Sequence, residues 1–129
     1  MPPVPPYAIA PVPFRFRALA LHAGRASLGG AREATLACYV TARLAAALLP
    51  ESELSMEDRV ARAAAARTWL ASLALPAPLR APLVKVIEST KGDDAHAAGV
   101  ALVTVADAAA SYLDGPALAE LRAFAAQLG

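Results

Sequence analysis

The sequence predicts an all-α fold, in which four to five helices form a compact antiparallel helical bundle behind an extended proline-rich N-terminal arm. Apolar residues from Ala31 onward recur every three to four positions, which is typical of amphipathic helices. Hydrophobic residues make up 57% of the chain, and many of them are alanine, the strongest helix former. The connections between the apolar segments are short, so consecutive helices should pack as antiparallel neighbours.

The 129 residues suit one domain, with an arm over residues 1–13 and the bundle over residues 14–129. The arm holds six of the eleven prolines, which fix φ and cannot donate backbone hydrogen bonds, so we expect it to be extended. Part of it resembles the proline-rich peptides that bind aromatic-lined grooves, namely Val4, Pro5, Pro6 and Tyr7. We favour the alternative that the arm packs onto its own bundle or onto another copy of the chain.

Residues 14–21 leave two structures open. Phe14 and Phe16 alternate with arginines, as in an edge strand. A lone strand would have no partner, because no other segment predicts a strong strand, so we favour a helix or an extended strap here.

Two helices are predicted next. The first spans residues 31–49 and ends at Pro50. The second begins after Ser55, whose hydroxyl can accept a hydrogen bond from the first turn, and extends to residue 74. Its inner side is expected to carry these residues: Met56, Val60, Ala63, Ala64, Leu70 and Leu73.

A shorter helix follows over residues 79–90, with Gly92 as its left-handed C-cap. The next helix is capped by Asp93 or Asp94 and reaches residue 113. Its apolar residues lie nearly all round, so we expect it at the centre of the bundle. The β-branched residues within 100–105 would also suit a strand, but the alanine-rich flanks favour helix. A last helix follows a turn at residues 114–116.

The net charge is +1, and its sign alternates along the chain. The blocks are +4 over residues 1–50, −4 over 51–58, +5 over 59–91 and −4 over 92–129. Such alternation favours elements that attract one another within one bundle. Near-neutrality argues against a nucleic-acid partner. Arg59, Arg62 and Arg67 could instead form a basic patch that binds an anion. We favour the interpretation that this basic face pairs with the acidic segment 51–58.

Neither catalysis nor metal binding has a clear set of residues. Cys38 could be assembled with His22 and Asp107, but no sharp turn or glycine-rich segment surrounds it. Asp93 and His96 are three apart, yet too few further ligands are available for a metal. We therefore expect no catalytic residues, no metal and no cofactor.

Several features bear on the compartment. One cysteine allows no intrachain disulfide, the N-terminus lacks the order of a signal peptide, and the two most apolar stretches are too short to span a bilayer. We expect a cytoplasmic protein that does not contact a membrane.

Asp107 is the one charge inside a helix predicted to be buried, where an unpaired carboxylate would be costly. It could pair with Arg43 or Arg67, line a pocket together with Tyr112, or lie on an exposed edge.

Three functions fit this sequence. The favoured one is a non-catalytic helical protein–protein interaction or oligomerisation module, whose partner is another protein or itself as a homo-oligomer. The second is a small helical ligand-binding protein or enzyme with an inter-helix pocket near Asp107. The third is a transcription-type regulator, for which residues 76–82 form a poor helix-turn-helix turn.

Overall fold

The computed structural model describes residues 16–25, 30–50 and 54–128. These residues contain six helices and no strand, so the all-α prediction is confirmed and the helix count is higher than four to five. The helices are α1 (Arg17–Arg25), α2 (Gly30–Ala46), α3 (Met56–Ala71), α4 (Ala77–Lys91), α5 (Ala95–Ala109) and α6 (Gly115–Leu128). The predicted arm, with Val4, Pro5, Pro6 and Tyr7, lies outside the described residues.

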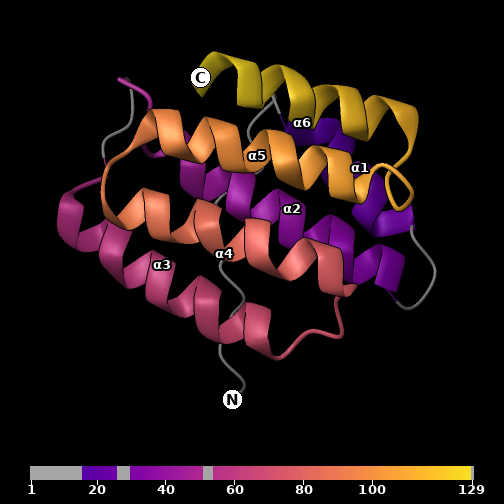
Figure 1. Cartoon of the computed structure of the whole chain (residues 1–129), viewed down its shortest axis with the longest axis horizontal. Coiled ribbons are helices and arrows are strands. Elements are labelled where there is room, and N and C mark those ends of the chain that lie inside the picture. The colour runs from indigo at the N-terminus through magenta and orange to yellow at the C-terminus, as the bar shows by residue number, and fades with distance from the viewer. Residues whose placement is uncertain (1–15, 26–29, 51–53, 129) are drawn as a thin grey trace.

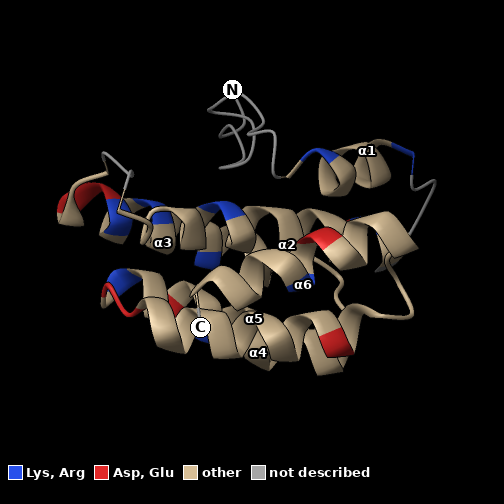
Figure 2. Ribbon diagram, turned by 90° about the horizontal axis from the view of Figure 1, so that it is seen from above, with Lys and Arg blue, Asp and Glu red and all other residues tan. Residues whose placement is uncertain are grey.

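Four consecutive helices, α3 to α6, lie side by side in chain order and form a curved layer (Figure 1). The α2 helix lies behind this layer and contacts each of the other five helices. Among the described helices, α1 packs only on α2 and α6. Figure 2 shows α1 on one side of the molecule and α4 and α5 on the opposite side. The outer face of α4 and α5 is therefore left uncovered by the described helices.

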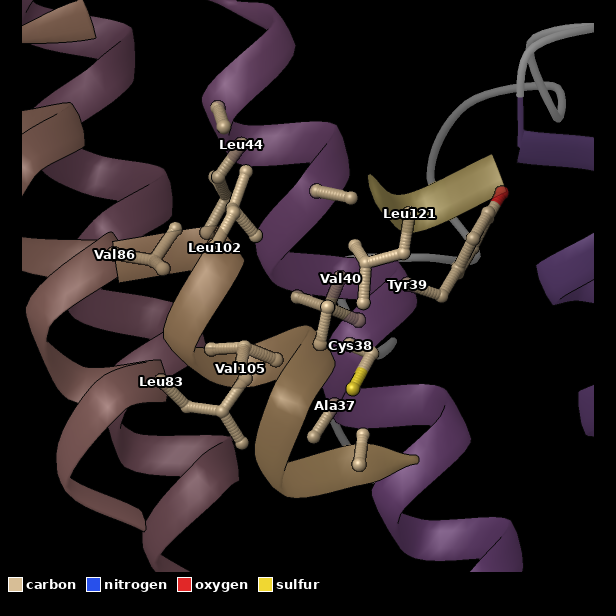
Figure 3. Packing of buried hydrophobic residues seen from close by; sticks show 14 of the residues in the cluster. Ala37, Cys38, Tyr39, Val40, Leu44, Leu83, Val86, Leu102, Val105 and Leu121 are labelled. Carbon is tan, nitrogen blue, oxygen red and sulfur yellow. The ribbon is translucent and has the colours of Figure 1, made fainter. Parts of the chain in front are cut away.

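The core is built around α2, whose small residues allow the other helices to approach closely. Its fully buried positions include Ala34, Ala37, Cys38, Ala42 and Ala45. Larger side chains from α2, α4, α5 and α6 point toward one another around it (Figure 3). In the described part of the chain, no helix is long and apolar enough to cross a membrane.

The expectation that the helix after Asp94 occupies the centre is wrong. In α5, Leu102 and Val105 are fully buried, but Val100 is 55% and Val103 is 46% exposed. The α2 helix takes the central place instead, because it has neighbours on all sides. The inner side predicted for α3 is also partly wrong, since Met56 and Val60 are 49% and 43% exposed.

Side-chain caps fix where α3 and α5 begin, and both were predicted from the sequence. Ser55 Oγ accepts a hydrogen bond from the backbone N–H of Asp58, with an N···O distance of 3.1 Å. Asp94 Oδ1 accepts one from Ala97 at 3.0 Å.

The predicted left-handed cap at Gly92 is wrong. Gly92 has φ −84°, and the left-handed residue is Asp93, with φ 56°. Aspartate tolerates this conformation better than most residues with a side chain. Arg59 pairs with the Asp93 carboxylate, so this turn is fixed against α3 by side-chain chemistry.

In residues 14–21, where the sequence left helix and strand open, the part from Arg17 onward forms the start of the short α1 helix, and residues 14 and 15 lie outside the described residues. Phe16, just before it, is fully buried and makes edge-to-face contacts with Phe124 and Tyr39, at ring-centroid distances of 5.1 and 6.2 Å. Glu120 of α6 accepts hydrogen bonds from the backbone N–H groups of Ala18 and Leu19. Tertiary contacts thus hold this helix in place.

Candidate protein-binding face between α4 and α5

A groove of about 570 Å³ runs between α4 and α5 on the uncovered face. Buried Pro82 and Ala101 form its bottom, because both line the groove and neither is exposed. The residues nearer its rim are Ala81, Lys85 and Ser89 from α4 with His96, Val100 and Thr104 from α5. The helices at this face lie in the front layer of Figure 1.

The exposed stripe of α5 has the spacing of a helix-pairing seam. His96, Val100, Val103 and Asp107 are separated by four, three and four positions and are all exposed. Alternation of three and four residues places side chains on one line along a helix, as in the seam of a coiled coil. Two exposed valines lie in the middle of this line, with a polar residue at each end.

Polar groups at the two ends of the stripe differ in character. At one end, His96 lies in the first turn of α5, where the helix dipole is positive. At the other end, Asp107 lies in the last turn, and its Oδ1 accepts a hydrogen bond from Arg122 of α6 at 2.9 Å. Lys85 adds a cation on the groove wall. The face therefore has an imidazole and the positive end of the helix dipole at one end, and a carboxylate at the other.

Asp107 is 64% exposed, which confirms the exposed-edge alternative over burial. Its ion-pair partner is Arg122 rather than Arg43 or Arg67. The groove reaches Thr104, one turn short of Asp107, so Asp107 is not among the residues that line it.

The other predicted pocket residues are not brought together. The Arg43 guanidinium lies over the ring of Tyr39, 5.5 Å from the centroid. Tyr112 offers its backbone carbonyl to His22 Nε2 at 3.2 Å. The Arg43 side chain and the Tyr112 backbone carbonyl therefore make these contacts with residues other than Asp107.

The basic face of α3 is partly neutralised by acids of the α4 side. Arg59 pairs with Asp93, and Arg67 pairs with Glu88. Arg62 lies on the same helix and is partly buried. In the described residues, Arg59 and Arg67 thus form ion pairs with acids at positions 93 and 88, and not with the acidic segment 51–58 that we expected.

Cys38 is a free cysteine that is fully buried in α2. Burial raises the pKa of Cys38 to about 12, so the nucleophilic thiolate is scarce. Within residues 16–25, 30–50 and 54–128, no group of three or more His, Cys, Asp or Glu side chains is placed to hold a metal ion.

Sequence reasoning missed the residues of the face, above all Lys85, Val100 and Val103. The four-three-four spacing from His96 to Asp107 was readable in the sequence. It was obscured because α5 is apolar on nearly every side, so no single stripe stood out. Comparison with protein-family models, curated proteins and solved structures finds no match for this chain.

Proposed function

We propose that the protein is a non-catalytic interaction module that binds a helix of another protein chain across the α4–α5 face. The observation that carries this proposal is the exposure of Val100 and Val103, 55% and 46%, on a helix whose inward side is fully packed. Large apolar side chains exposed together beside a groove are typical of partner-binding surfaces. A partner helix would present apolar anchors three and four positions apart to such a groove.

An enzyme that uses a nucleophilic side chain is less well supported. Nucleophilic catalysis needs a reactive nucleophile beside a base, whereas Cys38 is buried with a raised pKa and Asp107 is held by Arg122 at the surface. A DNA-binding regulator would need surplus positive charge, whereas Arg59 and Arg67 are already ion-paired.

Photo-crosslinking in the producing cells tests the module. A benzophenone side chain placed at position 100 lies in the proposed contact and should yield a discrete adduct of higher mass. The matched control is position 60, because Val60 is 43% exposed on α3, and α3 does not contact α5. Position 60 should give no such adduct.

Val103→Lys in the same chain provides the second control. A lysine there places a charge in the apolar contact, so the adduct from position 100 should disappear while circular dichroism stays unchanged. The proposal fails if position 100 gives no more adduct than position 60, or if Val103→Lys leaves the amount of adduct from position 100 unchanged.

A further inference from the structure

We propose that the helix bound across the α4–α5 face is α5 of a second copy of this chain, related by a two-fold axis and running antiparallel. This inference rests on the proposed function and names its partner. Its basis is that the exposed stripe of α5 is complementary to itself when two copies run antiparallel with Val100 of each opposite Val103 of the other.

The apolar part of the stripe matches its own reversal. A two-fold axis between positions 101 and 102 places Val100 opposite Val103 of the second copy, and Val103 opposite Val100. Both valines are then covered in both chains, as a closed isologous interface requires.

The polar ends match under the same operation. Asp107 of the second copy lies opposite His96, so a carboxylate meets an imidazole at each end of the contact. It also lies beside the first turn of α5, where the positive end of the helix dipole favours an anion. Lys85 on the groove wall adds a nearby cation.

The parallel alternative fails on the same residues. It would place Asp107 against Asp107 and His96 against His96, so like groups would meet at both ends. The two helix dipoles would also point in the same direction in a parallel pair, which is unfavourable for helices side by side. In the antiparallel pair they point in opposite directions.

Sedimentation velocity of the purified full chain over micromolar concentrations tests the partner. The protein should form a dimer, and Val100→Lys or Val103→Lys should each weaken dimerisation by about tenfold or more, because each buries two unpaired ammonium groups. Val60→Lys, on the exposed surface of α3, should dimerise like the unaltered chain. Circular dichroism checks that all variants remain folded.

Disulfide trapping under oxidised glutathione tests the register. His96→Cys and Asp107→Cys chains should crosslink when mixed, because these positions face each other. Either variant alone should not crosslink to itself, since eleven residues separate the two positions by about 16 Å along the helix. The native thiol does not compete, because Cys38 is fully buried.

The results distinguish a failure of the dimer from a failure of the proposed interaction module. A monomer at every concentration overturns the second-copy partner, and a photo-adduct at position 100 with another mass would then leave the interaction module standing. If the chain dimerises and neither lysine variant weakens dimerisation, the interface lies elsewhere and the inference is overturned. Self-crosslinking of the single-cysteine chains would show a parallel pair and overturn the register.

Discussion

Asp114 serves two helices with its two carboxylate oxygens. Its Oδ1 accepts a hydrogen bond from the backbone N–H of Ala117 at 2.9 Å and so caps α6. Its Oδ2 lies 2.8 Å from His22 Nδ1 and 3.6 Å from Arg25 Nη2, both on α1. The Ala117 hydrogen bond, helped by His22 and Arg25, holds the pKa of Asp114 below its usual value.

Removal of this carboxylate should destabilise the fold. Asp114→Ala deletes the cap and the contacts to α1, and the free energy of unfolding should fall by at least about 1 kcal/mol. Asp114→Asn keeps a capping oxygen and loses the charge, so its effect should be smaller. Urea unfolding at pH 7 measures both, and equal losses in the two variants would contradict the division between cap and charge.

The lowered pKa also fixes the sign of a pH effect. A carboxyl group with a depressed pKa in the folded state stabilises the fold above its ordinary pKa of about 3.9, and this stabilisation is lost as pH falls through the folded value. The gap in unfolding free energy between the unaltered chain and Asp114→Asn should therefore be present at pH 7 and close in acid. A gap that does not change with pH would show that the charge of Asp114 contributes nothing.

Single residues were predictable where the interaction is local. Ser55 and Asp94 bond to backbone groups three residues away, so sequence spacing suffices to find them. The left-handed position fell on Asp93 rather than Gly92, and the Asp93 carboxylate is ion-paired with Arg59 of α3, which lies far away along the chain. Partners far along the chain are not visible in local sequence.

At the scale of elements, α1 depends on its neighbours. A nine-residue helix is marginal in water by itself, because too few hydrogen bonds offset the cost of starting it. Glu120 of α6 accepts from the backbone N–H groups of Ala18 at 2.8 Å and Leu19 at 3.4 Å, at the positive end of α1. Burial raises the pKa of Glu120, although these two hydrogen bonds oppose that shift.

Glu120→Ala should release α1 selectively. The two N–H groups lose their acceptor, so the amide hydrogens of α1 should exchange with solvent faster while those of α4 stay protected. Glu120→Gln is the matched control, because its amide oxygen can still accept and it carries no charge to desolvate. Hydrogen–deuterium exchange measures both helices, and a uniform increase across the chain would mean that Glu120 acts on global stability instead.

The bounds of the helices could be predicted more closely than the sides that they bury. The period of α2 and the cap of α3 placed both helices within a few residues of their observed bounds. The side that α5 buries could not be read from its sequence, because valine and alanine occur all round it. The groove could not be predicted from the sequence for a further reason. It forms only because α4 and α5 pack side by side with α2 behind them.

At the scale of the molecule, one central helix and a curved layer determine what is left exposed. The α2 helix is covered by α1 on one side and by the layer of α3 to α6 on the other. Each described helix is thereby packed against at least two others, but nothing in the described residues covers the outer face of α4 and α5. Association through that face would bury Val100 and Val103 without disturbing the core.

A dimer formed in this way should couple association to stability. Mass action then makes the melting temperature of the unaltered chain rise with protein concentration, because the unfolded chain does not dimerise. The melting temperature of Val100→Lys should not change with concentration, and at high dilution the two proteins should melt together, since Val100 is already 55% exposed in the single chain. Differential scanning calorimetry over a hundredfold range, about 1–100 μM, makes this comparison. If Val100→Lys melts far below the unaltered chain even at high dilution, Val100 stabilises the single chain itself, and its exposure cannot be ascribed to a partner.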